Sequence, residues 1–250
     1  MPSEIFSLSS LVALDLSYNI LSGTTPSSIG KSLRFLYLQS NLLSGTIAPF
    51  NVDNSLIHLD YSFNNLNGTI PTFIGTYLTD LVLDYNFLSG PIPSTLYLLP
   101  SITTISVMNN NLFGSLPDYN LSSLVNFNIA NNHFMGKIPT MFVSSAKLSI
   151  CQLQNNQFTG TIPDIQLNKL TILNLAYNQL TGKIPTTLQL PSLTELYLND
   201  NQLFGTIPTQ VFSLTNLTIL DLSNNNFSGT IPSQLGLLRG LHYIDFSNNI

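Results

Sequence analysis

Charged residues are scarce in this sequence. They make up 8% of its 250 residues, with 7 Lys and Arg against 12 Asp and Glu and a formal net charge of -5. A nucleic-acid partner is therefore not expected, because binding to phosphates needs clustered basic residues. Cysteine is nearly absent too, and the single Cys151 allows no internal disulfide. In contrast, 44% of the residues are hydrophobic, which is enough to form a folded core.

Long uninterrupted hydrophobic segments are also missing. The longest stretch without a charge, 85–117, exceeds the ~20 residues of a membrane helix, but prolines, a glycine and three consecutive asparagines interrupt it. We therefore expect no membrane span. The start, PSEIFSLSS, lacks the basic, apolar and small-residue parts of a secretory signal.

The sequence is instead dominated by one internal repeat. The pattern LxxLxLxxNxLxGxIP returns every 22 to 24 residues, which is typical of a repeat array. We expect one array over 1–250, with a partial repeat at 1–10, ten repeats over 11–240 and a partial repeat at 241–250. Because stacked repeats need polar caps at both ends, we expect the chain to be a segment of a longer protein.

Each feature of the repeat has a structural reason. Alternating leucines predict a short strand with one buried face, and stacked coils then form a parallel sheet. The glycines of the repeat predict positive φ or a close approach of neighbouring backbones. The repeated asparagine is expected to bond backbone groups of its own and the next coil. This ladder comprises Asn19, Asn41, Asn64, Asn86, Asn110, Asn132, Asn156, Asn178, Asn201, Asn225 and Asn249.

The segment LDLSNNNFSGTIPSQLGLLRG, 220–240, carries this pattern almost throughout, and with it the chain resembles the plant-type leucine-rich repeat family. The resemblance implies a right-handed superhelix with a parallel sheet on its concave face and short 3-10 or irregular convex segments. It also implies that the chain acts as part of a receptor ectodomain, as a receptor-like protein or as an inhibitor of polysaccharide-degrading enzymes. An extracellular or cell-surface location follows if the chain belongs to a longer receptor-like protein.

Catalytic patterns are not found. Cys151 falls at a repeat position otherwise held by Leu, Ile or Phe, so it is expected to be a buried, unreactive core residue. His58, His133 and His242 lie in separate repeats without metal-ligand spacing, and no phosphate-binding glycine loop occurs. We expect no enzyme activity, cofactor or metal.

The remaining function is binding of a partner through a surface. The candidate residues are those that alternate with the strand leucines, because they line the concave sheet. A first group has Tyr18, Phe63 and Tyr85 beside it and contains Phe35, Tyr37, His58, Asp60, Asp80 and Asp84. A second group contains Glu195, Tyr197, Asp200, Asp221, Tyr243 and Asp245. His58 and Asp80 share a column, which predicts an ion pair. Asp221 and Asp245 are expected directly across adjacent strands.

The sequence therefore predicts a non-catalytic module that binds a protein or peptide across its concave face. The alternatives are an enzyme inhibitor of the same construction, or a carbohydrate, cell-wall or ice binder. That binder would use the uncharged positions Thr104, Ser106, Asn126, Asn128, Gln152, Gln154 and Asn174. Four conditional glycosylation sequons begin at Asn67, Asn120, Asn216 and Asn226, outside the concave strand positions.

Overall fold

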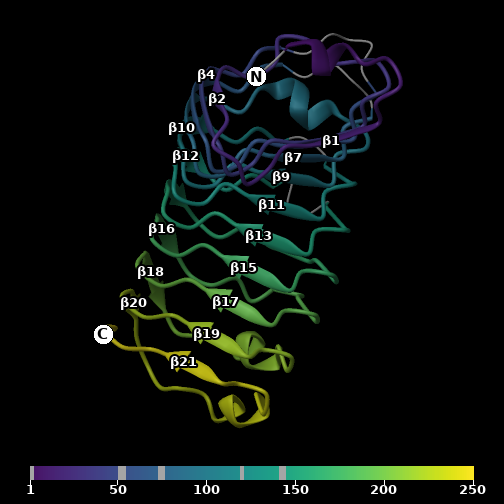
Figure 1. The fold of residues 1–250 in the computed structure, drawn as a ribbon. Coiled ribbons are helices and arrows are strands. Elements are labelled where there is room, and N and C mark those ends of the chain that lie inside the picture. The colour runs from purple at the N-terminus through teal and green to yellow at the C-terminus, as the bar shows by residue number, and fades with distance from the viewer. Residues whose placement is uncertain (1–2, 50–54, 73–76, 119–120, 141–144) are drawn as a thin grey trace. The chain divides into compact units, whose positions relative to one another are not determined.

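The computed structural model describes residues 3–49, 55–72, 77–118, 121–140 and 145–250. The chain divides between residues 114 and 115 into two compact units, each of which contains consecutive coils of the repeat. Figure 1 shows within each unit the same succession of a strand, a turn, a second strand and a return segment. Asn120, which begins one of the sequons, lies outside the described residues.

Unit 1 contains two parallel sheets whose strands alternate along the chain. The first sheet pairs β1 (Ala13–Asp15), β3 (Phe35–Tyr37), β5 (His58–Asp60), β7 (Asp80–Val82) and β9 (Thr104–Ser106). The second sheet pairs β2 (Ser22–Gly23), β4 (Leu42–Thr46), β6 (Asn65–Thr69), β8 (Phe87–Gly90) and β10 (Asn111–Ser115). Two short 3-10 helices, η1 (Ser3–Ser7) and η2 (Ser94–Leu98), occupy return segments.

Unit 2 repeats this arrangement. Its first sheet pairs β11 (Asn126–Asn128), β13 (Ile150–Gln152), β15 (Ile172–Asn174), β17 (Glu195–Tyr197), β19 (Ile219–Asp221) and β21 (Tyr243–Asp245). Its second sheet pairs β12 (His133–Lys137), β14 (Gln157–Gly160), β16 (Gln179–Gly182), β18 (Gln202–Gly205) and β20 (Asn226–Phe227). The 3-10 helices are η3 (Thr209–Ser213) and η4 (Ser233–Leu237). The predicted parallel-sheet solenoid with little helix is confirmed.

The core of each unit lies between its two sheets. The first-sheet strands place their middle residue inward, as with Leu36, Leu59 and Leu81, which are fully buried in unit 1, while in the last strand, β21, Ile244 is 40% exposed. Cys151 takes this inward position in β13 and is buried, as the sequence predicts. The flanking strand residues point outward, so their chemistry varies without disturbing the core.

The repeated asparagines bond the turn that follows each first-sheet strand. Nδ2 of Asn64 donates to the carbonyl oxygen of Leu38 at 3.0 Å and of Tyr61 at 3.1 Å, while its Oδ1 accepts from the Leu43 N–H at 3.0 Å. Leu38 and Leu43 belong to the preceding coil. The expectation for the ladder is confirmed for the asparagine's own coil and wrong for the next coil, because Asn64 bonds its own coil and the coil before it.

Glycine is required near the end of the second-sheet strand β6, just before the chain enters the return segment. Gly68 has φ +75, and a Cβ built on it would lie only 2.7 Å from Cγ2 of Thr46 in the preceding coil. The expected positive φ therefore holds at this position, whereas the close neighbour is the Thr46 side chain and not a neighbouring backbone.

Candidate functional site

The outward residues of β3, β5 and β7 form the first candidate surface, in unit 1. Strand register places Phe35 opposite His58, and His58 opposite Asp80. The same register places Tyr37 opposite Asp60 in the neighbouring column. All five side chains are half-buried, so they offer a partly desolvated polar and aromatic surface.

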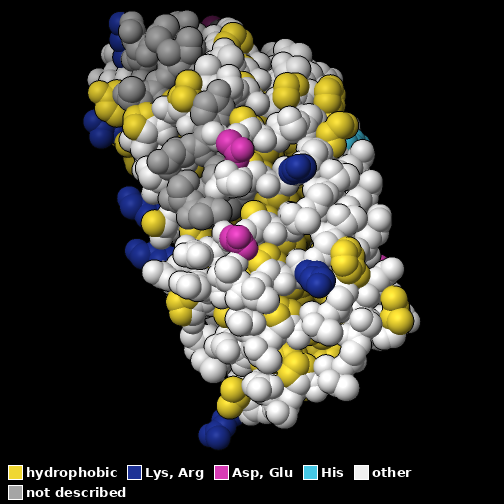
Figure 2. All heavy atoms as spheres, turned by 180° about the vertical axis from the view of Figure 1, so that it is seen from behind, with side chains coloured by type: hydrophobic (Ala, Val, Ile, Leu, Met, Phe, Trp, Pro, Cys, Tyr) yellow, Lys and Arg dark blue, Asp and Glu magenta, His cyan; other side chains and the backbone are white. Residues whose placement is uncertain are grey.

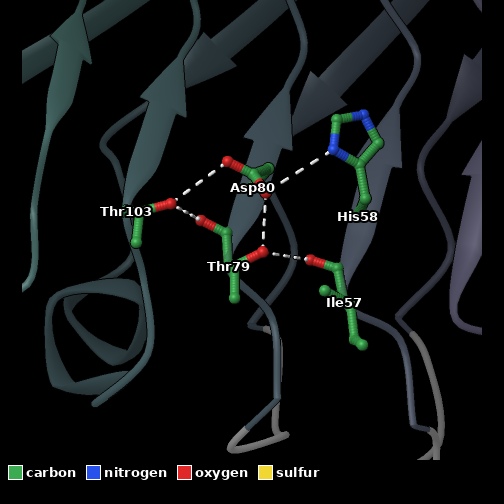
Figure 3. Close-up of polar contacts among 5 residues, drawn as sticks. All are labelled: Ile57, His58, Thr79, Asp80 and Thr103. Atoms are coloured by element: carbon green, nitrogen blue, oxygen red, sulfur yellow. Dashed lines mark hydrogen bonds and ion pairs between the residues drawn. The ribbon is translucent and has the colours of Figure 1, made fainter.

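His58 and Asp80 form a polar contact between adjacent strands on this surface (Figure 3). Nδ1 of His58 lies 3.6 Å from Oδ2 of Asp80. Oγ1 of Thr79 donates to Oδ2 at 2.6 Å, and Oγ1 of Thr103 donates to Oδ1 at 3.2 Å. The His58 contact, with help from the Thr79 and Thr104 side chains, holds the pKa of Asp80 well below its usual range. Asp80 is therefore a carboxylate at neutral pH.

An aromatic contact extends the His58 site toward the preceding coil. The rings of Tyr37 and His58 have centroids 4.8 Å apart and are tilted by 39°. This contact joins the two columns of the surface and fixes the imidazole between an aromatic ring and a carboxylate.

Asp84 bonds the following coil through both of its carboxylate oxygens. Oγ of Ser106 donates to both of its oxygens at 2.8 Å, and the Met108 N–H donates to Oδ1 at 2.7 Å. Burial, reinforced by the nearby charge of Asp60, raises the pKa of Asp84 to about 6 despite these hydrogen bonds. Asp84 thus bonds the following coil and presents little free acceptor capacity to a ligand.

Aromatic residues line one edge of the surface in an unusual backbone conformation. The residue before each ladder asparagine is left-handed, with φ between 53° and 56°. Asn tolerates this region best and occupies five of these positions, but Tyr18, Phe63, Tyr85 and Tyr177 are aromatic. Phe63 and Tyr85 stack with centroids 4.3 Å apart and an interplanar angle of 12°. The recurring Asn signals the conformation, although the stacking of these exposed rings could not be inferred from spacing alone.

The second candidate surface lies on the first sheet of unit 2. Asp221 pairs directly with Asp245, and Tyr197 pairs with Asp221. The Tyr197 hydroxyl donates to Oε2 of Glu195 at 3.1 Å, and the Tyr243 hydroxyl donates to Oδ2 of Asp245 at 3.3 Å. Burial, then the charge of Glu195, raises the pKa of Tyr197 to about 12. This group is thus a set of tyrosines whose hydroxyls bond acidic neighbours.

Asp200 lies at the edge of this second surface, beside Tyr177. The charge of Asp200 is the main cause that raises the pKa of Tyr177, and the charge of Asp221 adds to it. The two carboxylates therefore act on the same exposed phenol, which places Tyr177 with the second group.

The uncharged candidate positions also lie on first sheets. Thr104 and Ser106 belong to β9 of unit 1, while Asn126, Asn128, Gln152 and Asn174 belong to β11, β13 and β15 of unit 2, with Gln154 just after β13. Of the sequons, Asn67 and Asn226 lie on second-sheet strands and Asn216 lies in a return segment. All three are exposed.

The Cys151 thiol is a poor candidate for a nucleophile. Burial raises the pKa of the Cys151 thiol well above its usual range, which disfavours the reactive thiolate. Among the described residues, no group of three or more His, Cys, Asp and Glu side chains is arranged to hold a metal ion. No helix in the described part of the chain is long and apolar enough to span a bilayer.

In each unit, two parallel sheets joined by asparagine-bonded turns, with variable residues on the outside, define a repeat solenoid. Models described as leucine rich repeat match residues 10–31, 55–76, 168–212 and 191–249. The chain belongs to the leucine-rich repeat family. A comparison with curated protein sequences finds no match.

Solved structures give the same family from the fold. The plant peptide hormone receptor RGFR1, in complex with RGF2, is 33% identical, with a TM-score of 0.94 over 100% of this chain and 42% of that one. The Arabidopsis receptor kinase HAESA, in complex with the peptide hormone IDA and the co-receptor SERK1, is 28% identical with a TM-score of 0.74, over 100% and 51%. A plant ice-binding protein is 26% identical with a TM-score of 0.72, over 100% and 79%. The chain thus spans about half or less of each of the two receptors.

Proposed function

We propose that the chain is a non-catalytic peptide-binding module, and that the outward face of β3, β5 and β7 is its recognition surface. The observation that carries this proposal is the grouping of Phe35, Tyr37, His58 and Asp80 on consecutive strands of one sheet. Aromatic anchors among oriented polar groups are the usual make-up of an interface centre.

The comparisons support a peptide as the ligand class. RGFR1 and HAESA are both described in complex with peptide hormones, and both share the fold over the whole of this chain. An extended peptide suits a parallel sheet of short strands because outward side chains recur with the strand spacing of ~4.8 Å. A protein that presents such a segment, including a target enzyme, would use the same surface.

The first experiment is selection of short peptides that bind the wild-type chain from a displayed library. The variant combining Phe35→Ala, Tyr37→Ala and Asp80→Asn is expected to lose capture of the selected peptides while its melting temperature changes little. Phe87→Ala is the control, since Phe87 is an exposed aromatic residue on the second sheet, outside the proposed surface. Retention of the selected peptides by the triple variant would refute the proposed surface.

An extracellular location belongs to the same proposal. GASSHO1/SCHENGEN3, 29% identical with a TM-score of 0.68 over 100% of this chain and 37% of that one, is described as the ectodomain of a plant membrane receptor kinase. Exposed sequons at Asn67, Asn216 and Asn226 suit glycosylation in a secretory pathway. Expression through that pathway is expected to add glycans, detected as a mass decrease after enzymatic deglycosylation.

A second candidate function, binding to ice, is favoured by a different observation. Thr24, Thr46 and Thr69 repeat on exposed second-sheet positions of unit 1, and their methyl groups lie against the glycines of the following coils. Threonine thus recurs at the same repeat position in three consecutive coils. The structural similarity to a plant ice-binding protein points the same way.

The ice-binding candidate has its own test. Thr46→Lys is expected to abolish inhibition of ice recrystallisation, whereas Ser94→Lys, at an exposed position in η2, leaves it intact. Because Asn67 pairs with Thr46 in the sheet, a glycan on Asn67 would cover the row. A wild-type chain without effect on ice growth excludes this candidate, and retention on insoluble polysaccharide instead would assign the row to a carbohydrate.

A further inference from the structure

In the first four coils of unit 1, the residue before the ladder asparagine is aromatic except at one position, Ser40. Tyr18, Ser40, Phe63 and Tyr85 occupy the same left-handed position in consecutive coils, joined by hydrogen bonds from Tyr18 N–H to Gln39 O and from Ser40 N–H to Ser62 O. Tyr18 is 79% exposed, Phe63 51% and Tyr85 43%. Ser40 is therefore a small residue between two exposed aromatic residues, one coil away on either side.

The coil spacing sets the size of the group that fits there. Two coils separate Tyr18 from Phe63, so their backbones lie about 10 Å apart at a spacing of ~4.8 Å per coil. A planar group held over Ser40 would lie within ~6 Å of an aromatic ring on each side, the range in which a cation interacts with a ring face. On its other side Phe63 already stacks on Tyr85, which supports its ring.

Two carboxylates flank the same coil. Asp15 and Asp60 end β1 and β5 and both pair with Tyr37, which lies between them. In each carboxylate Oδ1 accepts hydrogen bonds from the serine two residues later, Ser17 or Ser62. Neither Oδ2 has a hydrogen-bond partner or ion pair within the described part of the chain. Both remain able to accept from a ligand.

Gln39, the residue before Ser40, adds a third acceptor. Its side-chain Oε1 is buried and has no hydrogen-bond partner among the described residues. An unpartnered buried acceptor is costly, and a change of the Gln39 rotamer that brings Oε1 to a ligand's donor would relieve this cost. The acceptors around Ser40 thus call for a ligand with several donors and a positive charge.

We propose that the Ser40 position binds the guanidinium group of an arginine in a peptide ligand, between Tyr18 and Phe63 and against Asp15 and Asp60. A guanidinium is planar, always charged and carries five donors, which matches two aromatic faces, two carboxylates and an amide oxygen. A lysine ammonium lacks the planar shape, and a proline ring lacks the charge. This inference rests on the proposed peptide function and names the side chain that the surface selects.

The test uses two blocked pentapeptides, Gly-Gly-Arg-Gly-Gly and the same peptide with citrulline, titrated into the full chain by calorimetry or NMR. Citrulline keeps the planar shape and loses the charge. The arginine peptide is expected to bind at least ~10-fold more tightly, since each 1.4 kcal/mol corresponds to a tenfold change in affinity. Asp60→Asn is expected to remove most of this preference.

Filling the interrupted position gives a sharper test. Ser40→Tyr places a third aromatic residue in the space and is expected to abolish binding of the arginine peptide without unfolding, because Tyr18, Tyr85 and Tyr177 show that Tyr is tolerated there. Asn109→Tyr is the matched control, since Asn109 has the same left-handed position in the coil after Tyr85. It is expected to leave arginine binding unchanged.

The outcomes separate this inference from the proposed function. Equal binding of the citrulline and arginine peptides, no binding of either, or full arginine binding by Ser40→Tyr would each overturn the arginine site. If library-selected peptides still depend on Phe35, Tyr37 and Asp80 in that case, the peptide function stands alone. If both experiments fail, the surface itself is wrong.

Discussion

Removal of one ladder asparagine is the most direct test of how the coils are held together. Asn64 is 6% exposed and makes bonds to two coils, whereas its neighbour Asn65 is exposed in β6. The substitution Asn64→Ala removes the side-chain amide and leaves the hydrophobic columns in place. Asn65→Ala makes the same chemical change one residue away and serves as the control.

The expected loss of unfolding free energy depends on which backbone groups lose their last hydrogen-bond partner. The Leu38 carbonyl still accepts from Asn41, and the Tyr61 carbonyl still accepts from Asn86. The Leu43 N–H, in a fully buried residue, loses its bond to Asn64. An orphaned buried donor costs about 1–3 kcal/mol and each shared bond less, so we expect a loss of about 3 kcal/mol.

Urea unfolding followed by circular dichroism measures this loss, since unfolding free energy falls linearly with urea concentration. Asn65→Ala is expected to stay within about 0.5 kcal/mol of the wild type, as for most exposed substitutions. Hydrogen exchange at the Leu43 amide should accelerate in the Asn64 variant. Equal midpoints for the two variants would refute the view that the ladder holds the coils together.

Three further predictions follow. Because the pKa of Asp84 is raised to about 6, the folded chain binds its proton more tightly than the unfolded chain, so stability falls as pH rises from about 4 to 7. Asp84→Asn should flatten this dependence and be up to about 3 kcal/mol more stable at pH 7, measured by urea midpoints at each pH. Gly68→Ala should cost about 1–3 kcal/mol in melting experiments, and Thr46→Ser should restore only the part due to the Thr46 methyl group, since the positive φ remains. Cys151 should react with a thiol reagent only after denaturation, and rapid labelling of the native chain would contradict its buried position.

The sequence predicts the fold well because each repeat carries the same constraints. The alternation around Leu36 and Leu59 predicts one strand per coil, and the shared period predicts that His58 lies opposite Asp80. Register in a parallel stack follows from counting, so columns of outward residues can be derived without coordinates. The same counting places Asp221 across from Asp245.

Interactions that depend on side-chain direction could not be derived this way. The period does not show that Asp84 turns toward Ser106 and Met108 instead of a ligand, or that Phe63 stacks on Tyr85. It also does not show whether a ladder asparagine bonds the preceding or the next coil. These outcomes depend on rotamers and on the left-handed residue before each asparagine, which vary while the repeat stays constant.

The backward reach of the asparagines gives the solenoid a polarity. Each coil relies on its successor to accept one of its backbone N–H groups, as Phe227 relies on Asn249. Deleting coils from the C-terminal side therefore leaves a backbone N–H of the last remaining coil without its hydrogen-bond partner. Of the bonds made by the ladder itself, deleting coils from the N-terminal side breaks those of a side-chain amide, which water can solvate, as in Asn19. Truncation from the two ends should therefore destabilise the chain unequally.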